Sequence, residues 1–464
     1  MHITSGNDAP PAYHNGTETS ISSDDEDEWK ADHLGEDDRI VWPARDKELI
    51  ANQPWCRKRY RLSLNGLHDE MIDVYEWLRP SALEKALRYC VFERVRRVIQ
   101  KLFPQAKVSV FGSLHTGLFL PSSDIDVVVE GDLWDQPPLW NTAEALKASG
   151  IADSIHVLDK AFVPIVKMVD KDTQISIDVS FNTIQGVRAA KYIEQMKVQF
   201  PVLEPLVLIL KQFLRQRHLN QGFTGGLSSY GLILMLIHFL QMYSYEDIVK
   251  KSIREVNMGV LLLNFLQLYG QEFNYMKTAI RIGSPYVCRE QMLNEMNRPS
   301  NSMLCIEDPL QRGNDIGRCS HNILFVRQAL EQALTTLCAV FIRSRESSPF
   351  WHTQYRGSLL SLILSISPRQ IRYRNWLRGR VLSDGLLPTQ QTESNNESTA
   401  GPEAFQPLAL NTRLVGGTHR SASLSSHSSL SASPRSNAPS LPPSSHQVQN
   451  HAILAMKDST STLP

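Results

Sequence analysis

Residues 108–129 read VSVFGSLHTGLFLPSSDIDVVV, two β-branched runs separated by a Gly-Ser pair and a turn-rich segment. Short runs of this composition, bounded by turn residues, predict strands. Residues two apart on a strand point the same way, so Asp124 and Asp126 present both carboxylates on one face. Ile125 and Val127 then face the core. The stretch therefore predicts a strand that carries a pair of acids into a site.

A third carboxylate lies on another alternating run, residues 175–181, which read ISIDVSF. The apolar residues of this run form one buried face, and Asp178 points the other way together with Ser176 and Ser180. If this strand lies beside the first, Asp178 joins the paired acids.

Such a set of acids predicts phosphoryl transfer with bound metal ions. Two carboxylates that lie so near to each other repel one another unless cations lie between them. Carboxylate oxygens are ligands that magnesium prefers. The set can hold two metals for in-line transfer, with Asp178 at the metal that activates the attacking 3′ hydroxyl. Gly112 and Ser113 would bring backbone amides and a hydroxyl against the phosphates. A lone D-x-D is usually a solvated strand end, but the three features together form a correlated set.

Composition places the patterned body of the chain between two polar ends. The chain has 464 residues and 42% apolar content, enough for two ordinary domains. Residues 1–40 hold eleven acids and two basic residues, so the rest carries a net charge of +9 and could accept a polyanion. The acidic start and the Ser/Pro-rich residues from 384 onward have too few apolar side chains to bury enough surface to offset the entropy lost on ordering. We therefore predict that both segments are disordered.

The body mixes strand and helix patterns. Strands are predicted at 108–111, 125–129, 162–169 and 175–181, and helices at 67–78, 82–103, 202–216, 229–242, 260–269 and 321–342. The pattern indicates a small α/β unit within a mostly helical one. The six cysteines show no zinc-finger or disulfide spacing, and the longest apolar run is too short to span a bilayer. Reduced thiols and no membrane insertion are expected.

Four motifs in order and spacing resemble one family. They are GSLHTGLFLPSSDID at 112–126, LKQFL at 210–214, FTGGLSSY at 223–230 and IEDPLQRGNDIGR at 306–318. Together they resemble the nuclear non-canonical poly(A) polymerases, the catalytic subunits of TRAMP-type complexes, within the DNA polymerase β-like nucleotidyltransferase superfamily. The resemblance covers about residues 54–380.

The resemblance implies an α/β catalytic nucleotidyltransferase domain with a polymerase β-like palm, packed on a mostly helical central domain, with disordered tails. Nucleotide would bind in the cleft between the two domains. We divide the chain into an acidic disordered segment at 1–53, a helical part of the central domain at 54–81, the catalytic domain at 82–190, the helical, poly(A) polymerase-associated central domain at 191–383 and the disordered tail at 384–464.

The resemblance also implies roles for individual residues. Asp124, Asp126 and Asp178 are the catalytic, metal-binding acids. Nucleotide contacts are implied for Gly112, Ser113, Gly186, Lys211, Ser229, Tyr230, Asn314 and Arg318. Lys211 would reach the triphosphate, Ser229 would touch phosphate, and Tyr230 would stack on the base. Asn314 and Arg318 lie in the nucleotide recognition motif. From the residues alone, Lys211 is equally a snorkelling or solvated lysine. Without the resemblance, residues 229–230 are better interpreted as an ordinary capped helix start with a core tyrosine, and residues 314–317 as a turn.

The implied function is that of a template-independent poly(A) RNA polymerase, a polynucleotide adenylyltransferase. It would add AMP from ATP to RNA 3′ ends by two-metal transfer with Mg²⁺ or Mn²⁺, in nuclear RNA surveillance and 3′-end processing. The chain lacks the family's RNA-binding modules, so we expect processive RNA capture to need a partner. The resemblance implies a zinc-knuckle RNA-binding protein and an RNA helicase as partners. The nuclear location rests on the resemblance, since residues 57–59 are too short an import signal.

Alternatives from two classes stay open. A terminal uridylyltransferase, or a cyclic-dinucleotide or oligoadenylate synthase, shares the acid triad, but Asn314 and the absent zinc-binding insertion argue against these. A catalytically inactive scaffold that binds RNA or partner proteins is the second class. The presence of all three aspartates argues against it.

Overall fold

The computed structural model describes residues 53–383, apart from Arg57, 132–133, Asp135, Phe162, 244–247, 297–301 and 346–356. The described residues belong to one compact unit. The segments for which we predict disorder, residues 1–52 and 384–464, lie outside the described residues, so that prediction is not tested.

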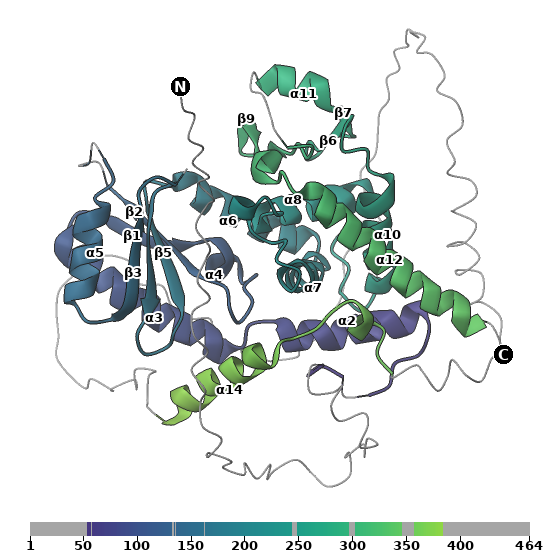
Figure 1. Cartoon of the computed structure of the whole chain (residues 1–464), viewed down its shortest axis with the longest axis horizontal. Helices are drawn as coiled ribbons and strands as arrows, with labels where there is room; N and C mark the ends of the chain where they lie inside the picture. Colours follow the sequence, from purple (N-terminus) through teal and green to yellow (C-terminus); the bar gives the residue numbers. More distant parts are fainter. Residues whose placement is uncertain are drawn as a thin grey trace, which may run out of the picture. The chain divides into compact units, whose positions relative to one another are not determined.

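A mixed five-stranded sheet, in the order β1-β2-β5-β4-β3, forms the α/β part (Figure 1). Its strands are β1 Lys107–Phe111, β2 Ile125–Glu130, β3 Ala152–Leu158, β4 Ile165–Asp170 and β5 Ser176–Phe181. β2 and β5 are parallel, and the other neighbouring pairs are antiparallel. The four predicted strands are confirmed. β3 was not predicted, because this edge strand is largely half-exposed and offers no apolar run.

Helices cover the apolar face of the sheet. α3 (Ala82–Leu102) and α5 (Leu139–Ala148) pack on the strands and form one core with them. That core includes Val95, Ile99, Leu146, Ile125, Val127, Ile177 and Val179. α3 begins at a capping box made by Ser81 and Glu84, which satisfies its first amides. The alternation that buries Ile125 and Ile177 leaves the acids on the opposite face, as predicted.

The other face meets α4 (Gly112–Thr116) and α6 (Ile184–Gln199), which contact each other and β1. Figure 1 shows α5 and α6 on opposite sides of the sheet. The domain boundary that we place between residues 190 and 191 falls inside α6. One continuous helix thus connects the two parts, and the division remains a proposal.

The second part is mostly helical, which confirms the predicted fold class. α2 (Leu64–Leu78) comes from the N-terminal flank and packs against α7 (Leu203–Arg215) and α10 (Met258–Gln267). The other elements are η1 Gly222–Thr224, α8 Ser229–Met242, η2 Leu268–Glu272, α11 Arg289–Met296, η3 Ile316–Cys319, α12 Ile323–Arg345, η4 Leu360–Leu362 and α14 Pro368–Ser383. Two short hairpin-like pairs complete it, β6 Thr278–Ala279 with β7 Val287–Cys288, and β8 Glu307–Asp308 with β9 Gln311–Asp315.

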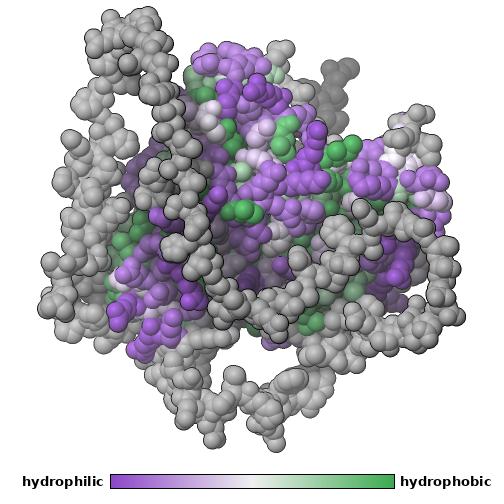
Figure 2. Space-filling view, turned by 180° about the vertical axis from the view of Figure 1, so that it is seen from behind, coloured by the Kyte–Doolittle hydropathy of each residue, from purple (hydrophilic) through white to green (hydrophobic). Residues whose placement is uncertain are grey.

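α12 is long and apolar enough to cross a membrane by length and composition alone. It packs on α10 and η2, however, and Val326, Leu330 and Leu337 are buried. Figure 2 shows hydrophilic and hydrophobic residues interspersed over the described surface of one face. We therefore interpret α12 as a core helix. All six cysteines are free thiols, as expected.

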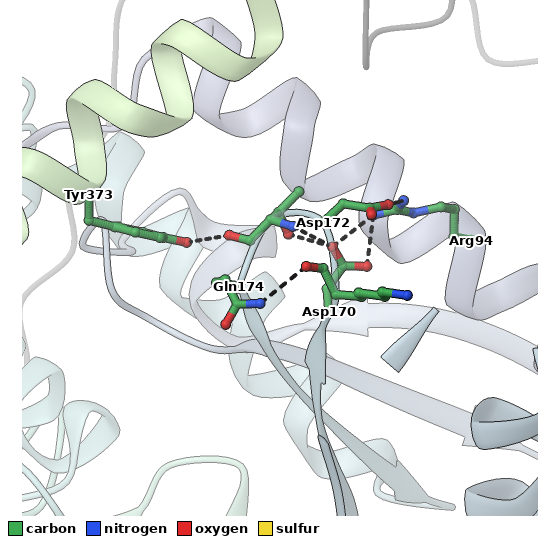
Figure 3. A network of polar contacts seen from close by, with 7 residues as sticks. Arg94, Asp170, Asp172, Gln174 and Tyr373 are labelled. Atoms are coloured by element: carbon green, nitrogen blue, oxygen red, sulfur yellow. Dashed lines mark hydrogen bonds and ion pairs between the residues drawn. The ribbon is translucent and has the colours of Figure 1, made fainter. Parts of the chain in front are cut away.

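α14 returns the chain to the sheet, a contact that the sequence did not predict. The helix contacts α3, and the Tyr373 hydroxyl donates to the Thr173 carbonyl at 3.0 Å, in the turn between β4 and β5 (Figure 3). Asp170, at the start of the same turn, accepts two bonds from the Arg94 guanidinium of α3 at 2.7 and 2.8 Å. The turn that leads into β5 is therefore held by α3 and by α14.

Candidate active site

The three predicted acids lie together on one face of the sheet, with Asp124 and Asp126 at the start of β2 and Asp178 on its neighbour β5. The parallel register of β2 and β5 places Asp126 directly opposite Asp178. Asp124, one residue before β2, is linked to Asp178 through Lys167 on β4. The Lys167 Nζ donates to Asp124 Oδ2 at 2.9 Å and to Asp178 Oδ1 at 3.1 Å. The prediction that β5 would lie beside β2 is confirmed.

The electrostatics of this cluster favour a divalent cation. Burial, followed by the charges of Asp178 and Asp124, raises the pKa of Asp126 to about 7. Burial also raises the pKa of Asp178, although Lys167 opposes this shift. Negative charge here is costly without a positive partner, and the Lys167 ammonium now lies between two of the carboxylates.

The carboxylates would have to turn before they could share an ion. Among the described residues, no three acidic, histidine or cysteine side chains already surround a metal-sized position. Asp178 is drawn towards Lys167, and Asp126 accepts a bond from the backbone N–H of Ser113. Rotation about the Cα–Cβ and Cβ–Cγ bonds of Asp126 and Asp178 can change both of these orientations. The three carboxylates supply the oxygen ligands that hard divalent cations prefer, and their negative charges balance the charge of such ions.

A pocket of about 650 Å³ opens beside the acids, and both parts of the fold contribute to its wall. Eight of the predicted site residues line it: Gly112, Ser113, Asp124, Asp126, Gly186, Lys211, Ser229 and Tyr230. Asp178, Asn314 and Arg318 are not in the lining. The pocket thus gathers residues that lie more than 100 positions apart in the sequence.

Gly112 lets the chain approach the acids closely. Its φ of +62° lies in the left-handed region, and an added Cβ would lie 2.2 Å from Asp126 Oδ2. No other residue fits without strain and displacement of that carboxylate. Gly186 has a similar role in α6, where a Cβ would lie 2.5 Å from the Phe111 ring. Both glycines therefore set the shape of the pocket.

Lys211 faces the pocket and is buried, so it is neither solvated nor extended to the surface. Its Nζ donates to the Leu118 carbonyl at 2.8 Å. Burial lowers the pKa of Lys211 to about 8, while Asp126 opposes that shift. A buried ammonium with a lowered pKa gains strongly from an incoming polyanion.

Sequence analysis missed two cationic residues of the site, Lys167 and Arg215. Arg215 lies one helical turn after Lys211 on α7 and lines the same pocket. Its guanidinium makes no hydrogen bond or ion pair within the described part of the chain. The i, i+4 spacing of two cations on an otherwise apolar helix could have revealed Arg215. Lys167 gave no such signal, since its role depends on the pairing of β4 with β5.

The predicted base-recognition residues form a short relay at the edge of the pocket. Tyr230 follows the first residue of α8, which Ser228 caps by accepting from the Gly231 N–H at 3.0 Å. The Tyr230 hydroxyl donates to Asp308 Oδ1 at 3.2 Å, and Asn314 Nδ2 donates to Asp308 Oδ2 at 3.1 Å. Asn314 is therefore connected to Tyr230 through the Asp308 carboxylate.

Arg318, the other predicted residue of the recognition motif, lies in η3, which contacts α8. Arg318 is not among the residues that line the pocket. The structure thus brings the motif that contains Asn314 and Arg318 next to α8. It does not bring either side chain into the lining of the pocket itself.

Two family models match the chain. Residues 67–197 match "Poly(A) RNA polymerase, mitochondrial-like, central palm domain", and residues 257–314 match "Cid1 family poly A polymerase". The matched ranges contain the acid triad and Asn314, respectively.

Similar proteins extend the match over about two thirds of the chain. Poly(A) RNA polymerase gld-4 of Caenorhabditis elegans is 47% identical over 356 residues, which cover 74% of this chain and 41% of that protein. Inactive non-canonical poly(A) RNA polymerase protein Trf4-2 of Drosophila melanogaster is 36% identical over 318 residues, which cover 67% of this chain and 76% of that protein. The solved structure of the polymerase core of TRAMP, an RNA surveillance complex, matches with a TM-score of 0.59 and 31% sequence identity. The match covers 67% of this chain and 98% of that one. The chain spans less than half the length of the nematode relative.

Proposed function

Because this chain belongs to the non-canonical poly(A) RNA polymerases, we propose that it adds adenylate from ATP to RNA 3′ ends without a template. The observation that carries the proposal is the position of Asp126 opposite Asp178 and beside Asp124. Asp124 and Asp126 line a pocket that Lys211 and Tyr230 also line. Acids and a phosphate-binding cation around one pocket are the parts that nucleotidyl transfer requires.

In the proposed mechanism the three aspartates would hold divalent cations, Mg²⁺ or Mn²⁺, which when bound neutralise phosphate charge and favour ionisation of the 3′ hydroxyl. Lys211 and Arg215 bind the triphosphate through charge-assisted hydrogen bonds. Ser229 and the free first amides of α8 add phosphate contacts. The RNA 3′ oxygen bonds to the α-phosphorus, the bond to pyrophosphate breaks, and the hydroxyl proton passes to solvent.

Base choice rests on the relay behind the pocket. Asp308 holds the Tyr230 ring in place, and the ring stacks on adenine. Asn314 offers both a donor and an acceptor without a change of protonation state. We propose that the relay favours a purine over a pyrimidine, and Gly112, Ser113 and Gly186 keep the pocket wall close to the nucleotide.

A primer-extension assay tests the proposal. Purified chain is incubated with a labelled oligo(A) primer, Mg²⁺ or Mn²⁺ and each nucleoside triphosphate separately. We expect extension with ATP, loss of extension in Asp124→Asn, and no change in Asp153→Asn, an exposed acid on β3. Extension by a homogeneous Asp124→Asn variant at the rate of the unchanged chain would contradict the proposed chemistry.

A non-catalytic scaffold is the second candidate, because one relative that is 36% identical is named inactive. The intact acid triad and the buried Lys211 favour catalysis in this chain, since a buried lysine is costly unless it has a function. The same assay separates the candidates. RNA binding without extension by any nucleotide would select the scaffold, and equal use of ATP and UTP would select a less specific transferase.

We also propose that the chain works in the nucleus, in RNA surveillance and 3′-end processing, with a zinc-knuckle RNA-binding protein and an RNA helicase. The support is its similarity to the polymerase core of TRAMP, an RNA surveillance complex. Affinity capture of the full chain from fractionated cells tests this setting. A chain found only in the cytoplasm, without such partners, would contradict it.

A further inference from the structure

The turn between β4 and β5 determines how two residues of the site face each other. Two backbone bonds close it: the Asp170 N–H donates to the Ile175 carbonyl at 2.8 Å, and the Gln174 N–H donates to the Asp170 carbonyl at 2.9 Å. The register that follows places Lys167 of β4 opposite Asp178 of β5. A turn with one residue more or fewer would shift this register and move Asp178 to the apolar face of the sheet.

This turn needs support from outside its own backbone. Gln174 has a φ of +56°, in the left-handed region that side chains other than glycine rarely adopt. A residue keeps such a conformation only where the surrounding structure fixes it. Here the Asp170 carboxylate accepts from the Thr173 N–H at 2.9 Å and from the Thr173 hydroxyl at 2.7 Å, and both residues are buried. The shape of the turn therefore depends on where Asp170 and Thr173 are held.

Two helices from distant parts of the chain hold these two residues from opposite sides (Figure 3). Arg94 of α3 donates to both oxygens of the Asp170 carboxylate, at 2.7 and 2.8 Å, and also pairs with Asp172. Tyr373 of α14 donates through its hydroxyl to the Thr173 carbonyl at 3.0 Å. Each of the two residues that shape the turn thus has one partner on a helix, and loss of either partner should loosen the turn.

α14 is itself held in place independently of the turn. Arg374 is buried and donates to Glu84 Oε2, in the first turn of α3, at 2.8 Å. The segment before α14 is bonded to α7, where Gln212 Nε2 donates to the Ser365 carbonyl at 2.9 Å. α7 also contributes to the lining of the nucleotide pocket. The Tyr373 hydroxyl therefore connects the turn to a helix that both parts of the fold hold.

We propose that Tyr373 is a positioning residue for the metal-binding acids, an inference that rests on the proposed function. Its bond keeps the turn in the geometry that presents Asp178 opposite Asp126, where the two carboxylates can bind one cation. Tyr373 is not in the lining of the nucleotide pocket, and it acts through Thr173 and β5. Loss of the bond should therefore weaken metal binding and slow the reaction, while ATP binding stays the same.

The experiment compares Tyr373→Phe with Tyr75→Phe in the full chain. Tyr75 is a matched control, because it is also half-buried and its hydroxyl donates to Glu204 at 3.0 Å, which joins α2 to α7 away from the sheet. Binding of Mn²⁺ is measured from the electron paramagnetic resonance signal of the free ion. We expect Tyr373→Phe to raise the Mn²⁺ Kd and to lower kcat in primer extension, each roughly threefold to tenfold, with the ATP KM unchanged at saturating Mn²⁺. Tyr75→Phe should alter neither the Kd nor kcat, although it loses a similar bond.

A folded Tyr373→Phe variant with the Mn²⁺ Kd of the unchanged chain would overturn the inference, and so would equal rises of the Kd in both tyrosine variants. If Tyr373→Phe does not fold, Arg94→Lys replaces it with the same expectation, because lysine keeps the charge and loses the paired bonds to Asp170. An unchanged chain that binds Mn²⁺ and extends no primer would refute the proposed function alone, and the Kd values would still decide the inference. An unchanged chain that binds no Mn²⁺ would contradict both.

Discussion

Replacement of Asp126 by asparagine should abolish nucleotide addition and at the same time stabilise the metal-free chain at neutral and alkaline pH. Asparagine has the same size and keeps an oxygen that accepts from the Ser113 N–H, but it carries no charge. Burial and the charges of Asp178 and Asp124 raise the pKa of Asp126 to about 7. The change therefore removes a repulsive charge from the folded state and a catalytic group from the site.

The sign of the pH dependence follows from the direction of this shift. Since the pKa of Asp126 is higher in the folded than in the unfolded chain, the folded chain binds more protons between the two values. The favourable contribution of the protonated acid is present below about pH 4 and is lost as the pH rises through about 7. A shift of this size corresponds to about 4 kcal/mol above pH 7. Because the side chain opens on a solvated pocket, we expect a gain of about 1–3 kcal/mol at pH 8.

Urea denaturation in EDTA, followed by circular dichroism at pH 5 and pH 8, measures the gain. The advantage of Asp126→Asn over the unchanged chain should be about 1–2 kcal/mol larger at pH 8 than at pH 5. Asp153→Asn, an exposed acid on β3, should show no such difference. Added Mg²⁺ should stabilise the unchanged chain more than the variant. A variant that is less stable at pH 8, or an advantage that does not depend on pH, would refute the reasoning.

Three further outcomes are expected. Gly112→Ala should lower kcat on the order of 100-fold, because its Cβ displaces the Asp126 carboxylate, whereas Gly150→Ala, with positive φ but open space, should leave kcat unchanged. Asn314→His should shift the ATP to UTP ratio towards UTP, by on the order of 1–3 kcal/mol at most, and an unchanged ratio would remove Asn314 from base choice. Burial lowers the pKa of His238 to about 4, so stability should fall as the pH drops below about 6.5, and unfolding measurements should show that His238→Leu removes about 2 kcal/mol of the loss between pH 7 and pH 5.

The sheet and the long helices could be predicted because their residues alternate or repeat around a buried core. α8 begins and ends as predicted, and α3 and α7 begin and end within one residue of the prediction. The elements that were missed depend on long-range contacts. α14 reads PRQIRYRNWLRGR over most of its length and has few aliphatic residues. It is held mainly by Tyr373 and Arg374, whose partners lie about 200 and 290 residues earlier.

The acids of the site could be predicted from alternation, but their pairing could not. β5 lies between β2 and β4, so the order along the chain does not give the order in the sheet. Lys167 becomes part of the site only because β4 pairs with β5 in the register that places it opposite Asp178. Arg215 lies one residue beyond the family motif, so only its i, i+4 spacing from Lys211 could have predicted its place in the site.

The division of the chain into a catalytic and a helical domain hides how much the site depends on both. The sheet supplies the acids, but the pocket beside them is completed by Lys211 and Arg215 from α7 and by Tyr230 from α8. α14 fixes the turn that leads into β5, because the Tyr373 hydroxyl donates to the Thr173 carbonyl. Residues 82–190 alone would keep all three carboxylates and lose every cation that we assign to phosphate. The three like charges would remain close together, without the cations that bind the triphosphate.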